Sequence, residues 1–197
     1  MVMLTTLATI REALEIPVAE VDAQMDANLT RYILAISAAI ETYCDRLFEL
    51  AAYDVRLEGK DRKKMSLPQW PVVTVTEIKH GDDILTTSDY RLDANAGMIE
   101  KVTGTWTEDV NAKFTAGYVL PPDPDRNLPY DIEHACLLWA MLQYNTINKA
   151  GIKSERIDDI AVNYESPFAV SVSTGGKIFP APPTVMAMLN SYRRMKP

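Results

Sequence analysis

Residues 129–145 read PYDIEHACLLWAMLQYN, and this stretch predicts the central helix of the fold. Pro129 suits the first position of a helix, where its missing N–H leaves no hydrogen bond unmade. Asp131 and Glu133 suit the first turn, because the helix dipole favours negative charge there. The glycine at 151 is a typical stop after a last turn. The sequence therefore predicts a helix from Pro129 to about Lys149.

The middle of this predicted helix is apolar on nearly every side. Between Ile132 and Leu142 only Glu133 and His134 are polar. A helix with almost no polar face is buried all round. We therefore expect it at the centre of the fold or at a subunit interface, and the two positions are compatible.

The pair His134 and Cys136 raises the question of catalytic or metal chemistry. Two residues apart on a helix, their side chains point to opposite sides and cannot make the contact that a Cys–His nucleophile needs. The only other histidine is His80, beside a turn at Gly81. A zinc site needs three or four ligands, and no typical ligand spacing is present. We therefore expect no catalytic, metal or cofactor site.

Paired carboxylates offer a competing chemistry. The pairs are Asp82/Asp83, Asp123/Asp125 and Asp158/Asp159. Such pairs serve general acid–base catalysis or cation binding. Each pair here lies near glycine or proline, where aspartate commonly forms turns. A surface role is favoured, and a small hydrolase using a pair such as Asp158/Asp159 is the competing hypothesis.

The clearest amphipathic helix lies earlier in the chain. Its apolar stripe, at spacings of three and four, consists of Leu29, Ile33, Ile36, Ile40, Cys44 and Leu47. Ala35, Ala38 and Ala39 form a second flank with little bulk. This small flank packs against a neighbouring core helix or, on the sharper hypothesis, against another subunit.

Two shorter helices are predicted at the ends of the chain. The first is capped by Thr5 or Thr6 and stops before Pro17. The last starts at Pro183 or Thr184 and ends in basic residues, the sign that a helix C-terminus favours.

The segment between the long helices has the composition of strands. Residues 51–118 are rich in Val, Ile, Thr and Tyr and are interrupted by glycines. We expect about five short antiparallel strands here. The predicted fold class is α+β and mainly α: a bundle of about four helices with an inserted small antiparallel β-unit. The predicted domains are a helical core (1–50 and 119–165), the β-unit (51–118), and a C-terminal loop and helix (166–197) that binds a partner.

The charge, apolar runs and cysteines of the chain indicate which partners and which compartment to expect. The formal net charge is −7, so general attraction to nucleic acid is not expected. No apolar run reaches the 18 residues of a membrane span, and the N-terminus lacks the pattern of a signal peptide. Two cysteines in apolar helical patterns suit a reducing compartment better than a disulfide framework.

The order of these features resembles the head–tail connector proteins of tailed bacteriophages, also called adaptor or head-completion proteins. The matching stretches run in family order over about residues 4 to 165: LATIREALEIP, AISAAIETYCDRLFE, LPQWPVVTVTEIKHGDDILTTSDYRLD, GMIEK, VNAKFTAGY, LPYDIEHACLLWAMLQYN and SERIDDIAVNYE. The most specific feature is the join of FTAGY, through a proline-rich segment, to LPYDIEHA. The same module occurs in prophages and gene transfer agents.

The resemblance implies a structural assembly protein and no enzyme. Family members form a homo-oligomeric ring, commonly of twelve copies, beneath the portal protein. The ring extends a channel through which DNA passes without sequence-specific binding, and it docks a downstream stopper or tail-completion protein. The implied location is the head–tail junction of the virion, after assembly in the bacterial cytoplasm.

The resemblance also implies a portal contact at the C-terminus, because this segment often reaches toward the portal in the family. The candidate contact residues are Ile178, Phe179, Val185, Met188, Leu189, Tyr192, Arg193 and Arg194. A tail-completion or terminator ring protein, which is usually richer in β-structure, is the alternative within particle assembly.

Overall fold

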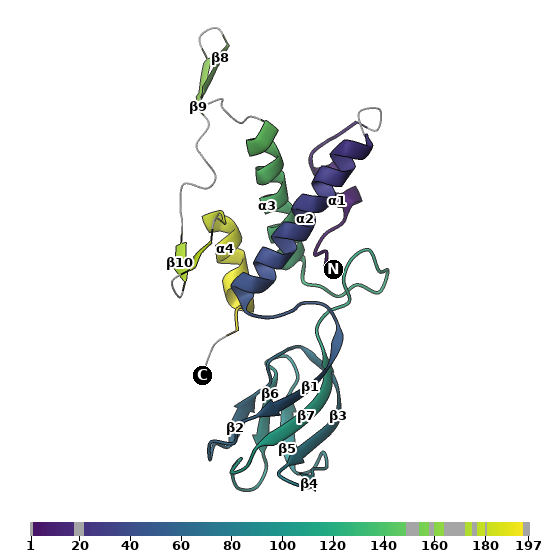
Figure 1. Ribbon diagram of the computed structural model, residues 1–197, viewed down its shortest axis with the longest axis vertical. Coiled ribbons are helices and arrows are strands. Elements are labelled where there is room, and N and C mark those ends of the chain that lie inside the picture. Colours follow the sequence, from purple (N-terminus) through teal and green to yellow (C-terminus); the bar gives the residue numbers. More distant parts are fainter. Residues whose placement is uncertain are drawn as a thin grey trace. The chain divides into compact units, whose positions relative to one another are not determined.

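The computed structural model describes residues 2–17, 22–148, 154–157, 160–163, 172–174, 177–179 and 181–194 (Figure 1). Its internal contacts divide the chain into two compact units. The helical unit comprises residues 1–45, 121–124 and 128–197, and the β-unit comprises residues 46–120 and 125–127.

The helical unit is built on four α-helices, which are α1 (Leu7–Ala13), α2 (Ala23–Cys44), α3 (Tyr130–Asn148) and α4 (Pro183–Leu189). Side chains cap the first two, since the Thr6 hydroxyl accepts from the Thr9 N–H and the Asp22 carboxylate accepts from the Met25 N–H. These caps satisfy amides that a helix start leaves without a partner.

The core of the helical unit lies between α2, α3 and α4, which pack side by side (Figure 1). Helix α1 packs against α2 and α3. Fully or nearly fully buried side chains from the four helices include Ile10, Leu29, Ile33, Ile36, Ile40, Ile132, Trp139, Val185 and Leu189. The spacing of three and four residues along α2 accounts for the apolar face that it presents to this core.

Two antiparallel sheets form the β-unit. The four-stranded sheet has the order β1-β7-β3-β4, and the three-stranded sheet has the order β2-β6-β5. The strands are β1 (Ala51–Leu57), β2 (Lys64–Ser66), β3 (Val72–His80), β4 (Asp83–Ile84), β5 (Tyr90–Asp93), β6 (Met98–Lys101) and β7 (Val110–Ala116).

One hydrophobic core joins the two sheets. Strand β7 alternates strictly, and its inward residues Val110, Ala112, Phe114 and Ala116 are buried. Ile99 of β6 and Tyr90 of β5 reach the same core from the other sheet. The β-unit is therefore a small sandwich with its own interior.

The predicted fold class, a helical bundle with an inserted small β-unit, is wrong because it underestimates the β-structure. The β-unit is no small insertion in a helical bundle, because its seven strands form two packed sheets. Two of the four helices, α1 and α4, have only seven residues each. The error has a physical source, since strands of two or three residues such as β4 and β2 are too short to show a hydrophobic period.

The irregular pairing of β3 explains why apolar and polar residues do not alternate clearly in its sequence. Its pairing with β7 shifts register between Val72 and Thr74 and again between Val75 and Glu77. A β-bulge of this kind changes which residues face inward. Val72 and Ile78 are buried and Val75 is half-buried. Val73, which follows Val72 directly, is 56% exposed.

Beyond α3 the backbone forms two further antiparallel hairpins. Strands β8 (Ser154–Ile157) and β9 (Ile160–Asn163) pair with each other, as do β10 (Val172–Thr174) and β11 (Lys177–Phe179). Each hairpin is a separate two-stranded sheet.

Candidate assembly surfaces

The histidine and cysteine of α3 have unrelated environments. Cys136 is fully buried, and burial raises the pKa of its thiol to about 12. Its sulfur lies 3.6 Å from the hydroxyl of Ser37 on α2, so it serves as a packing residue in the α2–α3 contact. His134 is exposed on the helix. The side chains do not form a nucleophile pair.

His80 belongs to a different part of the fold. Its Nδ1 lies 2.8 Å from the ammonium of Lys101, and its Nε2 accepts from the Glu108 N–H at 3.1 Å. The imidazole also meets the Trp106 ring edge-on at 5.6 Å. These contacts attach the end of β3 to the loop before β7, which is a structural role.

Within the described residues, no three side chains among His, Cys, Asp and Glu are grouped as metal ligands. The pairs Asp82/Asp83 and Asp123/Asp125 are exposed. The pair Asp158/Asp159 lies outside the described residues. No helix in the described part of the chain is long and apolar enough to cross a membrane.

The C-terminal helix α4 is part of the helical core. Val185 is 0% and Leu189 is 1% exposed, and α4 packs against α3. Beyond α4, the Tyr43 hydroxyl donates to Asn190 at 2.7 Å, and the Arg194 N–H donates to the Cys44 carbonyl at 2.8 Å.

The other candidate portal-contact residues are nearer the surface. Met188, Tyr192, Arg193 and Arg194 are half-buried. The guanidinium of Arg193 lies 4.8 Å from the centre of the Tyr43 ring. Ile178 and Phe179 fall in β11, and their side chains lie outside the described residues.

The three alanines of the candidate subunit interface differ in exposure. Ala35 and Ala38 are exposed on α2, whereas Ala39 is half-buried. On α3, Leu137, Leu138 and Met141 are also half-buried, so the described residues do not cover the apolar helix all round. The helical unit thus presents apolar surface on two of its helices.

The β-unit carries exposed apolar side chains, of which the sequence singled out only Leu47; its predicted place on the apolar stripe of the second helix is wrong, because α2 ends at Cys44. They are Leu47, Leu50, Val73, Ile84, Leu92 and Val102, each between 36% and 63% exposed. Alternation could have identified Val73 only if the bulges of β3 were known. Isolated exposed apolar residues are ordinary, but several in one small unit suit a protein that assembles.

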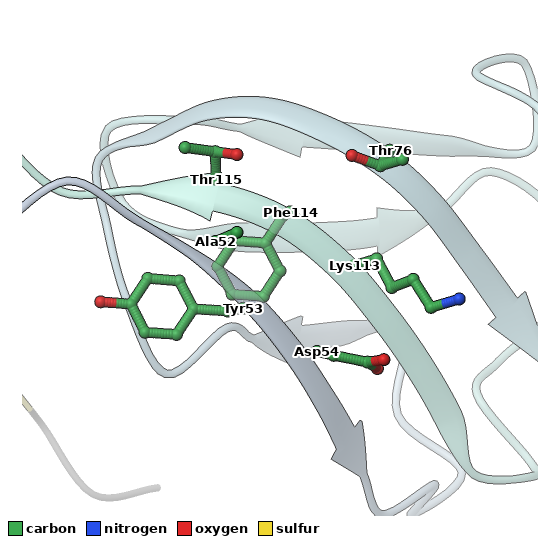
Figure 2. A pocket seen from close by; sticks show the side chains of 7 residues that line it. All are labelled: Ala52, Tyr53, Asp54, Thr76, Lys113, Phe114 and Thr115. Carbon is green, nitrogen blue, oxygen red and sulfur yellow. The ribbon is translucent and has the colours of Figure 1, made fainter.

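The outer face of the four-stranded sheet is lined with charge. Asp54, Lys113 and Glu77 lie opposite one another on β1, β7 and β3, and Lys113 pairs with Glu77 at 3.1 Å. This ion pair lowers the pKa of Glu77 and raises that of Lys113. A shallow depression lies here (Figure 2), lined by Ala52, Tyr53, Asp54, Thr76, Lys113, Phe114 and Thr115.

Two carboxylates, Glu58 and Glu100, partly offset the charge of the three lysines Lys60, Lys63 and Lys64 at the start of β2. Lys63 and Lys64 lie 3.1 Å and 3.7 Å from the carboxylate of Glu100. Lys60 pairs with Glu58 at 3.1 Å. Paired, exposed lysines of this kind make a weak phosphate site.

Similar folds occur in the necks of gene transfer agent (GTA) particles. One solved chain, from the neck of an empty GTA particle computed with C6 symmetry, shares 20% identity and a TM-score of 0.56 over 98% of this chain and 91% of its own. Another, from the virion of a native GTA particle, shares 23% identity with the same TM-score and coverage. A third, from the neck of a native particle computed with C12 symmetry, gives 22% identity and a TM-score of 0.51 over 96% and 88%. No curated protein matches the chain.

The family model named head completion protein matches residues 3–195, which is nearly the whole chain. The match includes both long helices, the complete β-unit and α4. The chain therefore belongs to the head completion protein family.

Proposed function

We propose that this protein is a structural head–tail connector that forms a ring under the portal of a phage or phage-like particle. The observation that carries the proposal is the family match over residues 3–195. In this role the ring extends the DNA channel of the portal and docks a downstream stopper or tail-completion protein. Its place is the head–tail junction, reached after synthesis in the host cytoplasm.

The likeness to neck proteins of GTA particles supports a ring of many copies. A closed ring needs two different faces on each copy, because each subunit contacts its neighbours head to tail. The half-buried leucines of α3 and the exposed Ala35 and Ala38 of α2 are the proposed faces in the helical unit. Twelve copies is the proposed stoichiometry.

An acidic ring suits a channel for DNA. The net charge of −7 repels phosphates, so the duplex slides through without being held. The contacts of Lys63 and Lys64 fit this role, since the carboxylate of Glu100 offsets part of their charge.

The proposed role needs no catalysis. The buried thiol of Cys136 and the structural contacts of His80 support a non-enzymatic function. A divalent cation that raised the melting temperature by several degrees would instead favour the carboxylate-dependent hydrolase, by linkage.

The amount of β-structure does not by itself distinguish a connector from a tail-completion or terminator ring protein. Terminator rings are expected to be rich in β-structure, and this chain has a sandwich of seven strands beside its helices. The decisive difference is the partner, because a connector binds the portal directly.

Co-sedimentation with portal rings tests the proposal. Deleting the last twenty residues is a poor variant, because it removes α4 from the helical core. The charge reversal Arg194→Glu keeps α4, and Arg91→Glu on exposed β5 is the matched control. We expect wild type and Arg91→Glu to sediment with the portal and Arg194→Glu to bind at least tenfold more weakly. Wild-type protein that stays in the supernatant would refute the connector role.

A further inference from the structure

One end of the three-stranded sheet carries a run of positive charge. Arg62, Lys63 and Lys64 are consecutive and exposed, and β2 is the outermost strand in the order β2-β6-β5. The register places Lys64 opposite Glu100 of β6. Lys63 reaches the same carboxylate at 3.1 Å, and Lys64 lies 3.7 Å from it. We call the three residues Arg62, Lys63 and Lys64 the basic edge.

One carboxylate cannot balance the three cations of the basic edge. The side chains of Lys63 and Lys64 are 57% and 60% exposed, whereas that of Glu100 is 28% exposed. Among the described residues, Arg62 makes no ion pair. The hydrogen bond from Lys63, and then the charges of Lys64 and Lys63, lower the pKa of Glu100, so this carboxylate is already engaged. The basic edge therefore keeps an excess of positive charge in a chain whose net charge is −7.

The turn between β3 and β4 carries the opposite charge. Asp82 and Asp83 are consecutive and exposed, and neither makes an ion pair with a residue that the structure describes. The carboxylate of Glu108 packs against Gly81 in the same turn, so closely that a Cβ on this glycine would overlap it. Three carboxylates thus gather at one end of the four-stranded sheet.

An apolar side chain accompanies each of these charged groups. Ile84, directly after the two aspartates, is 63% exposed. Beside the basic edge, Met98 lies opposite Ser66 and is half-buried. Met98 points to the outer face of its sheet, because its neighbour Ile99 is fully buried on the inner one. Apolar contacts surrounded by charge are typical of protein interfaces, whereas an acidic chain repels DNA phosphates.

We propose that the β3–β4 turn of one copy, with Asp82, Asp83 and Ile84, binds the basic edge of the next copy in the ring. The two aspartates would balance the charge that Glu100 leaves over, and Ile84 would cover Met98. Complementary charge of this kind fixes which surfaces meet and in which orientation.

This contact rests on the proposed ring and adds a direction to it. The turn belongs to the four-stranded sheet and the basic edge to the three-stranded sheet, so each copy carries both surfaces at different places. Each copy would give its turn to one neighbour and receive a turn from the other, which is the head-to-tail contact that a closed ring requires.

Crosslinking with a carbodiimide tests the contact, because this reagent joins a carboxylate to an amine only where the two touch. Equal amounts of light and isotopically heavy protein are mixed, bound to portal rings, sedimented and crosslinked. We expect peptides that join Asp82 or Asp83 to Lys63 or Lys64 and carry one light and one heavy half. The crosslink from Lys63 to Glu100 within one chain is the internal control for the reagent. At about 1 M salt, where the Debye length is about 3 Å, the crosslinks between copies should weaken.

Charge reversal supplies a second readout. Asp83→Lys and Lys64→Glu should each weaken binding to portal rings at least tenfold, because each places like charges together in the ring. Both changes in one chain should restore most of the binding, and a double variant as weak as the two losses combined overturns the proposal. Arg91→Glu is the matched control for Lys64→Glu, since Arg91 also lies opposite Glu100 but on β5. Glu12→Lys, exposed on α1, is the control for Asp83→Lys. Both controls should bind like the wild type.

The outcomes separate this contact from the connector role. Portal binding without crosslinks between light and heavy copies overturns the contact and leaves the connector role intact. Such crosslinks in solution, without portal binding, support the contact and count against the connector role. The loss of both refutes both. Labelled duplex DNA that binds the wild type and is released by Lys64→Glu would assign the basic edge to phosphates and overturn the proposal.

Discussion

Replacing Leu189 by alanine tests whether α4 is packed in the helical core or is a free arm. Leu189 is 1% exposed on α4, which packs against α3, and the sulfur of Cys44 on α2 lies 4.0 Å from its carbonyl oxygen. The change removes buried carbons worth about 0.8 kcal/mol each and leaves a cavity. We expect a loss of about 3 kcal/mol in the free energy of unfolding, within the range of about 2–5 kcal/mol for such changes.

Urea unfolding followed by circular dichroism at the helix band measures this loss. A thermal melt should show a fall of about 6–12 °C for a chain of this size. Met188→Ala is the matched control, because the neighbouring side chain is only half-buried and should cost about 1 kcal/mol or less.

Equal stability of wild type, Leu189→Ala and Met188→Ala would refute the packing of α4. In that case α4 would be a free arm before assembly, and Val185 and Leu189 would be available to the portal. The predicted loss instead limits the portal contact to the outward side of α4 and the residues after it.

Three further predictions concern buried groups. Cys136, whose pKa is raised to about 12, should resist a thiol reagent at pH 8 and react after denaturation, and rapid native reaction would contradict its burial. Gly117→Ala should lower the free energy of unfolding of the β-unit by more than about 2 kcal/mol in a urea titration, because φ is 112° and a Cβ would lie 2.5 Å from the Glu49 carbonyl oxygen. Gly104→Ala is the control, because Gly104 also has a positive φ but faces open space, and it should cost clearly less. Arg46→Lys should cost about 2 kcal/mol, since the guanidinium stacks 4.0 Å from the Trp70 ring and donates to the Trp70 carbonyl, and an unchanged midpoint would refute that role.

The helices were largely predictable because their signals are local. The structure uses Thr6 as the first cap, starts α3 directly after Pro129 and starts α4 at Pro183, all at predicted positions. Helix α2 begins at Ala23, six residues before the first leucine of its apolar stripe, since the cap at Asp22 and not the stripe decides the start. Caps and prolines act within one turn, so sequence reveals them.

The β-sandwich was underestimated because its interior depends on distant residues. Trp106 is fully buried and pairs through its backbone with Arg62. Arg46 is 3% exposed among aromatic rings, although charge alone predicts a surface position. No period along the chain encodes such contacts, which follow from tertiary packing.

The candidate sites likewise show that local features were predictable and that contacts between distant residues were not. Sequence correctly separated His134 from Cys136, because helix geometry is local. It gave no warning that Val185 and Leu189 would be buried in the helical core while Met188 stays near the surface. The portal contact of the C-terminus and the subunit role of Ala35, Ala38 and Ala39 stay predictions.

Electron microscopy of the purified protein mixed with portal rings shows directly whether the protein is a head–tail connector. We expect an added ring of density, stacked coaxially beneath the portal, into which the helical unit and the β-unit fit as separate bodies. Portal rings that show no added density, at protein concentrations well above the portal concentration, would contradict it.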